Sequence, residues 1–325
     1  MSGMYSDCSV EREHPMNKTP QVLAGEDRVI VIFLDGVGIG EPDLEKNLFF
    51  QDDFQFLRDI FGEVPHLGLQ RLNKDGVFCF PVDAVMGVDG FPQSGTGQIS
   101  LLCGINAQKK LGMHFGPYPH SQLRPVLEEK NIFSILKTRH KQVAYLNAFP
   151  KVYFDIVKKR HQAFGAIAYA AHSAGLRLGT ASDVRKGKRL TGEITNARWN
   201  ARLGYRLPVI KPETAAGRLL KISREHHFVL YEYFLTDYIG HGRVREEKSS
   251  LMQSLSAFLT SVVRGIDEDT TLIIFSDHGN AEDLSLKHHT MNPAIGIAAG
   301  RRASLFAKKV KKLSDYYKII LTILE

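Results

Sequence analysis

The sequence RVIVIFL at residues 28–34, followed directly by DGVGIG at residues 35–40, decides the fold of this 325-residue chain. A near-continuous apolar and β-branched run is typical of a strand buried on both faces of a parallel sheet. The abrupt change to Asp35 and a glycine-rich turn predicts a loop at the carboxyl end of that strand, where ligands bind in open α/β sheets. We therefore expect a central strand with a functional loop after it.

Two later segments repeat this form of a buried strand that leads to an aspartate. Residues 228–235 (FVLYEYFL) lead to Asp237, and residues 271–275 (TLIIF) lead to Asp277. The carboxyl ends of parallel strands meet at one edge of a sheet, so Asp35, Asp237 and Asp277 are expected to converge. Since Asp35 and Asp277 are far apart in the chain, the pattern predicts a site formed by tertiary structure.

Helical periodicity is clearest at residues 212–225 and 248–266, and the alternation of strands with helices predicts an α/β doubly wound sheet. The middle of the chain is richer in basic residues and turn formers, with no strand that leads to an aspartate. We expect three parts: a polar tail at 1–27, a catalytic core at 28–105 and 211–325, and an inserted cap or substrate domain at 106–210.

Composition excludes several classes of protein. No apolar run approaches the ~18 residues that span a bilayer, so a membrane-spanning protein is excluded. The three cysteines are scattered and form no CxxC pair, and the N-terminus lacks the pattern of a secretory signal, so we expect a cytoplasmic protein. The net charge of +7 suits a small phosphorylated substrate. Nucleic acid is not expected as a partner, because no nucleic-acid-binding motif is present.

Polar groups that follow strands or lie in glycine-rich turns form a set of oxygen and nitrogen donors. The set is Asp35, Ser94, Asp237, His241, Asp277, His278 and His289. Carboxylates and imidazoles without thiolate suit divalent ions such as Mn²⁺, Zn²⁺ or Mg²⁺. The DxxxH spacing of Asp237 and His241 places both side chains on one side of a helical turn.

Each of these features alone has an ordinary structural explanation. Asp-Gly after a strand is commonly a turn, DxxxH is commonly a solvated helix face, and a serine in PQSGTGQ (residues 92–98) serves as a helix cap. His288 and His289 are equally typical of a surface pair. The coincidence of three strands that each lead to an aspartate favours a metal site over these separate explanations.

The motifs FLDGVGIG, PQSGTGQ, TDYIGH, SDHGNAED and HHTMNPA resemble, in this order, signatures of the metalloenzyme branch of the alkaline phosphatase superfamily. That branch contains cofactor-independent phosphoglycerate mutase and phosphopentomutase. The resemblance covers about residues 28–105 and 226–300 and is weak between them. It implies an alkaline phosphatase-like fold and a two-metal phosphoryl-transfer enzyme that acts on a small phosphorylated metabolite through a phosphoserine.

The resemblance also implies a role for each residue. One ion would be held by Asp237, His241 and His289, and the other by Asp35, Ser94, Asp277 and His278. The ions would be Mn²⁺ or Zn²⁺, with Mg²⁺ as the alternative. Ser94 would be the nucleophile, with Thr96 as the alternative phosphoryl acceptor. Of the two adjacent histidines, His289 matches because it directly precedes TMNP.

The chain departs from the family pattern in two respects. It is far shorter than a full-length mutase, and Gln98 stands where both mutases have a histidine. The candidates for phosphate contacts in the middle segment are Lys186, Arg189, Arg198 and Arg202, although a basic run is often only solvated. Two other functions therefore stay open: a metal-dependent phosphatase or phosphodiesterase, and a non-catalytic binding protein on the same fold.

Overall fold

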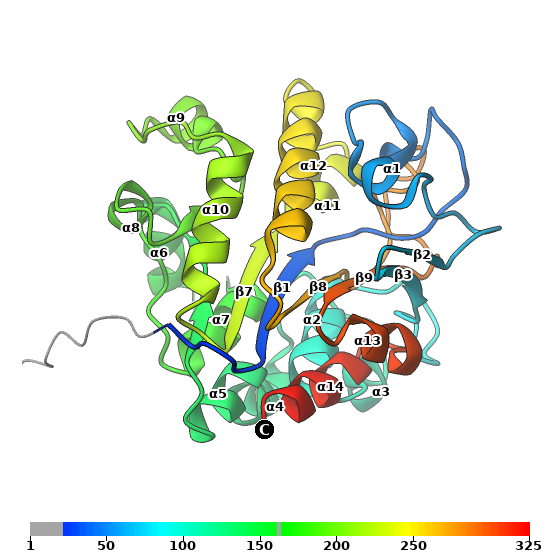
Figure 1. The fold of residues 1–325 in the computed structure, drawn as a ribbon. Helices are drawn as coiled ribbons and strands as arrows, with labels where there is room; N and C mark the ends of the chain where they lie inside the picture. The colour runs from blue at the N-terminus through cyan, green and yellow to red at the C-terminus, as the bar shows by residue number, and fades with distance from the viewer. Residues whose placement is uncertain (1–21, 161–163) are drawn as a thin grey trace, which may run out of the picture.

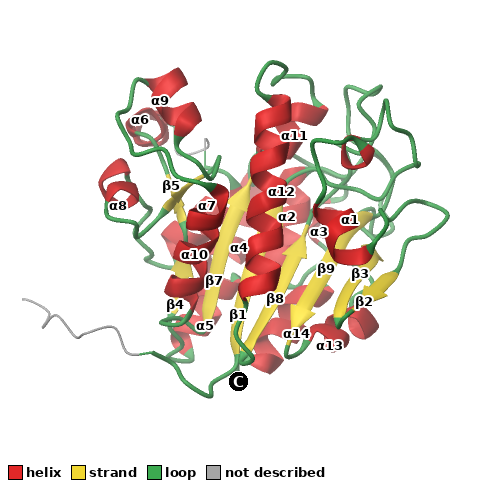
Figure 2. Cartoon of the chain, turned by 45° about the horizontal axis from the view of Figure 1, so that its top comes forward, coloured by secondary structure: helices red, strands yellow, loops and turns green. Residues whose placement is uncertain are grey.

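The computed structural model describes residues 22–160 and 164–325, so most of the expected polar tail lies outside the described residues. A seven-stranded sheet in the order β2-β3-β9-β8-β1-β7-β4 forms the centre of the molecule. Figure 2 shows these strands side by side. Their bounds are β1 Arg28–Leu34, β2 Leu72–Lys74, β3 Val77–Val82, β4 Val143–Tyr145, β7 Phe228–Tyr233, β8 Thr270–Phe275 and β9 Ala294–Gly300.

The central strand β1 lies between β7 and β8 and is parallel to both. Every residue of β1 is buried. The alternation of side chains sends Val29, Val31 and Phe33 to one face of the sheet, and Ile30, Ile32 and Leu34 to the other. The prediction of a strand buried on both faces at residues 28–34 is confirmed, and the fold is α/β with a mostly parallel sheet, as expected.

Helices cover both faces of the sheet (Figure 1). The core on one face includes residues of α2, α3, α4, α5, α7, α13 and α14, and the core on the other face includes residues of α1, α10, α11 and α12. The bounds are α1 Phe56–Phe61, α2 Ser94–Cys103, α3 Ala107–Leu111, α4 Arg124–Lys130, α5 Ile132–Thr138, α7 Ala166–Ser173, α10 Pro212–Ser223, α11 Leu235–Gly240, α12 Lys248–Gly265, α13 Ala303–Lys309 and α14 Asp315–Ile323. The helices expected at 212–225 and 248–266 are α10 and α12.

The segment 106–210 does not stand apart as a whole. Its strand β4 pairs in parallel with β7 in the main sheet, and α4, α5 and α7 bury side chains in the main core. A smaller group of elements lies beside the β4 edge of the sheet (Figure 2). It contains β5 Asn147–Ala148, β6 Leu190–Thr191, α6 Lys151–Lys159, α8 Ala181–Arg185 and α9 Ala197–Leu203. The segment expected as an insert thus contributes elements both to the main sheet and to this smaller group.

The smaller group has a core of its own, in which Val184, Trp199 and Leu207 are buried together with Ala148.

The remaining elements of the described residues are two short 3-10 helices, η1 Leu48–Phe50 and η2 Ser121–Leu123. No helix in the described part of the chain is long and apolar enough to cross a membrane.

Candidate metal centre

The sheet places the carboxylates of the site by strand alternation. Asp35 directly follows β1 and continues the face of Phe33, and Asp277 follows β8 on the face of Phe275. Asp237 lies in α11, the short helix after β7. All three are therefore at the carboxyl edge of adjacent parallel strands, which is where ligands bind in this class of sheet.

Asp35, Asp277 and His278 form one buried cluster, in which one donor atom from each residue lies within 4.8 Å of the others. His278 Nε2 lies 3.4 Å from Asp35 Oδ1 and 3.6 Å from Asp277 Oδ2. Ser94 joins them, because its Oγ is 2.9 Å from the same nitrogen. The four residues expected to hold one ion are thus brought together.

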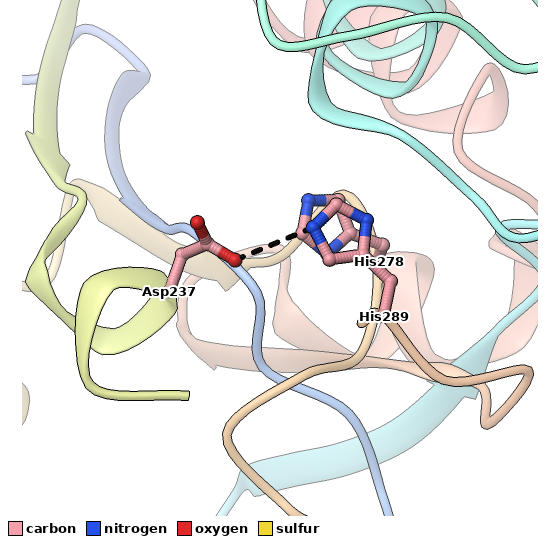
Figure 3. Close-up of side chains that lie close together, drawn as sticks. All are labelled: Asp237, His278 and His289. Carbon is pink, nitrogen blue, oxygen red and sulfur yellow. Dashed lines mark ion pairs between the residues drawn. The ribbon is translucent and has the colours of Figure 1, made fainter. Parts of the chain in front are cut away.

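Asp237, His278 and His289 form a second buried cluster with the same limit on distance. Figure 3 shows the Asp237 carboxylate facing the two imidazoles, with a dashed line for its ion pair with His289 at 3.5 Å. The rings of His278 and His289 stack with centroids 3.8 Å apart, so His278 joins the two clusters. His241 Nε2 lies 3.4 Å from Asp237 Oδ2 and 3.2 Å from His289 Nε2.

Burial and the charges nearby shift the pKa values of Asp35, Asp277, His278 and His289 so that the neutral forms are favoured. Burial and the nearby carboxylate of Asp277 raise the pKa of Asp35 well above its usual value. Burial and Asp237 raise the pKa of Asp277 to about 7. Burial lowers the pKa of both His278 and His289 to about 4. The imidazoles are therefore neutral at pH 7, which is the form that binds a metal ion.

The charge and the donor atoms of these residues fit a pair of divalent cations. Three buried carboxylates converge, and Asp35 Oδ1 is buried without a hydrogen-bond donor. Among the described residues, the ion pairs of Asp35, Asp237 and Asp277 are with histidines and not with lysine or arginine. Oxygen and neutral imidazole donors are the ligands of Mn²⁺, Zn²⁺ and Mg²⁺. A bound cation would remove the repulsion that raises these pKa values.

The two candidate acceptors point in different directions. Ser94 begins α2 and contacts His278, whereas Thr96 Oγ1 lies 3.3 Å from the carbonyl oxygen of Gln93, to which it donates, and accepts from the backbone of Phe115. Thr96 is fully buried. Only the hydroxyl of Ser94, of these two, therefore lies among the carboxylates and imidazoles.

Gln98 has a definite role in place of the family's histidine. Its Nε2 donates a hydrogen bond of 3.2 Å to Asp277 Oδ2. The amide thus orients one candidate ligand from one turn along the same helix as Ser94.

The adjacent histidines also separate in space. His289 is buried and its Nδ1 lies 2.6 Å from the carbonyl oxygen of Pro92, whereas His288 is exposed. The His288 ring is tilted against that of Phe91 rather than stacked parallel to it. The Pro92 carbonyl fixes the ring orientation of His289 and directs its Nε2 toward Asp237.

Three of the four basic residues expected to contact phosphate make their contacts elsewhere, and the fourth, Lys186, is exposed at the C-terminal cap of α8. Arg198 and Arg202 both pair with Glu247. Arg189 donates to the carbonyl oxygen of Lys188. For Arg198 or Arg202 to bind a substrate phosphate, the ion pair with Glu247 would have to open.

Sequence reasoning missed three residues that surround the cluster. Glu232 lies at the end of β7, where it accepts a hydrogen bond from Tyr145, and burial raises its pKa to about 7. Asn280 donates to Asp237 Oδ1 at 2.6 Å. Glu282 is buried between the loops that carry the ligands. Two features of the sequence could have indicated two of them. Glu232 is a lone glutamate in the apolar run 228–235, and Glu282 is an acidic residue within the motif SDHGNAED.

The fold and the site define the class of protein: an alkaline phosphatase-like α/β fold with a candidate binuclear metal centre. A family model described as the Metalloenzyme superfamily matches residues 211–325, which contain Asp237, His241, Asp277 and His289. This match confirms the resemblance seen in the sequence and indicates a metal-dependent enzyme. No curated protein matches the sequence of this chain.

Solved structures with a similar fold are remote in sequence. The PH0037 protein from Pyrococcus horikoshii is 13% identical with a TM-score of 0.54, and the match covers 92% of this chain and 97% of that one. The alkaline phosphatase of the Antarctic bacterium TAB5 is 12% identical with a TM-score of 0.49, covering 92% and 98%. Leishmania mexicana phosphoglycerate mutase is 14% identical with a TM-score of 0.37, covering 60% of this chain and 37% of the mutase.

Proposed function

We propose that this protein is a two-metal phosphoryl-transfer enzyme similar to phosphoglycerate mutase. It would act on a small phosphorylated metabolite through a phosphoserine formed at Ser94. One observation carries the proposal: the Ser94 hydroxyl, at the start of a helix, lies in the same cluster as three carboxylates and two neutral imidazoles. A hydroxyl in that position is a nucleophile that the surrounding donors can activate.

The proposed ligand sets are those that the resemblance implies, and they differ from the second cluster because His241 takes the place of His278 beside Asp237 and His289. Asp237, His241 and His289 would hold one ion, and Asp35, Asp277, His278 and Ser94 the other. When bound, the two ions would lower the pKa of the serine hydroxyl and neutralise charge on the phosphoryl oxygens. The backbone N–H groups at the start of α2 favour an anion at the same place.

The chain's own groups account for the covalent step. Ser94 Oγ forms a bond to phosphorus while the bond from phosphorus to the leaving alcohol oxygen breaks, and the proton that Ser94 loses ends on that alcohol oxygen. The phosphoryl group then passes either to another hydroxyl of the same metabolite, which completes a mutase reaction, or to water, which completes hydrolysis. Gln98 and the carbonyl of Pro92 hold Asp277 and His289 in place meanwhile.

Hydrolysis is a second candidate function, as a metal-dependent phosphatase or phosphodiesterase. The observation that favours it is the ion pairing of Arg198 and Arg202 with Glu247. A mutase must retain its dephosphorylated intermediate and exclude water, and arginines that are already paired contribute less to retention.

The test is incubation with a panel of phosphorylated sugars and glycerates in Mn²⁺, with both free phosphate and isomerised product measured. Isomerised product supports the mutase, and free phosphate alone supports the phosphatase. A phosphoenzyme trapped with substrate should map to residues 92–98 and be absent from Ser94→Ala, with Thr96→Ala as the matched control. No turnover and no phosphopeptide across the panel would refute the proposed function.

A further inference from the structure

Three loops hold or directly follow four of the seven candidate ligands, and each lies against the other two. The first is residues 36–40 after Asp35, the second is residues 276–282, and the third is residues 289–293. Backbone hydrogen bonds join them: Ile39 to the Pro293 carbonyl at 2.9 Å, and Thr290 to the Gly279 carbonyl at 3.0 Å. The relative positions of the ligands therefore depend on how firmly these loops are held.

Glu282 is one side chain that bonds to all three loops, and it is only 2% exposed. Its Oε2 accepts from the backbone N–H of Gly38 at 2.9 Å and of Asn280 at 2.8 Å. Its Oε1 accepts from the Thr290 hydroxyl and from Asn292 Nδ2 at 3.2 Å. Four donors thus satisfy one carboxylate, which forms no ion pair among the described residues.

The loops approach this carboxylate so closely that only glycine fits. A Cβ atom on Gly38 would lie 2.5 Å from Glu282 Oε1, and a Cβ on Gly279 would lie 2.2 Å from the same oxygen. A Cβ on Gly40 would lie 2.7 Å from Glu282 Cγ. Real Cβ atoms do not come this near to other atoms, so the backbone of two loops is in direct contact with the side chain. A side chain larger than that of glycine at any of these three positions would have to displace the carboxylate.

We infer that Glu282 is a positioning residue that fixes the separation of the two ion subsites without touching either ion. The inference rests on the proposed two-metal function and deepens it. Glu282 acts on Asp35 through Gly38, on Asp277 and His278 through Asn280, and on His289 through Thr290. Loss of such an outer contact weakens metal binding by about 10–100-fold in comparable sites.

Glu193 supplies a matched control. It is 3% exposed and accepts hydrogen bonds from the backbone of Trp199 at 3.2 Å and from Thr195 Oγ1 at 2.9 Å. Like Glu282, it is a buried glutamate satisfied by a backbone N–H and a threonine, but it lies beside α9. Glu193→Ala therefore measures the effect of losing a buried glutamate that stabilises the fold but lies away from the metal site.

The experiment compares Mn²⁺ affinity and the visible spectrum of the Co²⁺-loaded protein across Glu282→Ala, Glu282→Gln and Glu193→Ala. Glu282→Ala should bind Mn²⁺ about 10–100-fold more weakly and show a changed Co²⁺ spectrum, which reports ligand geometry. Glu282→Gln should recover most of the affinity, because its amide oxygen still accepts from the two backbone donors and its amide N–H₂ donates to Thr290. Glu193→Ala should leave both readouts unchanged.

A further variant, Thr290→Val, keeps the shape of the side chain and removes one donor to Glu282, so it is informative even where Glu282→Ala does not fold. It should weaken Mn²⁺ binding, and an affinity equal to that of the wild type would overturn the inference. Two bound ions in the wild type with unchanged affinity in Glu282→Ala would overturn it while leaving the proposed function intact. A wild type that binds no Mn²⁺ would overturn both.

Discussion

Asp277→Asn should have opposite effects on stability with and without metal. In the metal-free fold, burial and the carboxylate of Asp237 raise the pKa of Asp277 from 3.8 to about 7. A raised pKa means that the folded state binds more protons than the unfolded state between these values, so this carboxyl destabilises the fold as pH rises through that window. Each pKa unit corresponds to about 1.4 kcal/mol, so the cost at pH 8 is up to about 4 kcal/mol.

The expected result in chelator at pH 8 is a rise of about 3–8 °C in Tm for Asp277→Asn, because the neutral amide removes the repulsion. At Mn²⁺ concentrations above about 1,000 times Kd the order should reverse. The wild type there gains more than about 4.1 kcal/mol, which exceeds the cost of the buried carboxylate, whereas the variant lacks one ligand and loses most of that gain. Thermal unfolding in chelator and in Mn²⁺ measures both effects.

Asp183→Asn is the control for this measurement. Asp183 pairs with Arg177 and forms a capping box with Thr180, and the hydrogen bonds from Arg177 lower its pKa. Its replacement should lower Tm by a similar amount in chelator and in Mn²⁺. If Asp277→Asn also lowers Tm in chelator, the carboxylates do not repel one another in the metal-free fold, and the reasoning fails.

Three further results are expected. Elemental analysis in saturating Mn²⁺ should give two ions per chain, and one or none would exclude the binuclear centre. His289→Ala should lose one ion, whereas the exposed His288→Ala should keep both, and equal losses would show that the burial of His289 is not what selects it. Gly97→Ala should reduce turnover, because its Cβ would lie 3.0 Å from Asp277 Cβ and push α2 away from the site. Gly217→Ala is the control: its Cβ would meet nothing within 4 Å, and the change should raise the free energy of unfolding by about 0.5–1 kcal/mol. Normal turnover in Gly97→Ala would show that α2 tolerates the shift.

The local pattern of the sequence was sufficient for the central strands. Residues 28–34 form β1 with the expected bounds, because a short β-branched run that ends in a glycine-rich turn is typical of a strand buried on both faces. The helix expected at 212–225 begins at the predicted proline and ends at Ser223, two residues early, since terminal turns depend on contacts that periodicity does not report.

The membership of β4 could not be predicted in the same way. Val143–Tyr145 is three residues long, and its place in the main sheet depends on pairing with β7 more than 80 residues later. Glu232 was missed for a related reason. Only the register of β7 beside β1 shows that its side chain lies on the face of Asp35 and Asp277.

The directions of side chains also required the structure. The resemblance assigns the acceptor role to Ser94 and leaves Thr96 as the alternative, and the placement of α2 against the loop at Phe115 turns Thr96 away. The contacts of the basic residues in α9 could not be predicted from the sequence either. Their charge was visible in the sequence, but their pairing with Glu247 was not.

The position of β1 between β7 and β8 has a consequence for how the chain folds during synthesis. Both neighbours of β1 are encoded about 200–240 residues after it. At about 5–20 residues per second, the ribosome needs roughly 10–50 s to produce them. For that interval an apolar strand has neither of its native partners, so the nascent chain depends on chaperones or on temporary contacts with α2 and its neighbours to prevent aggregation.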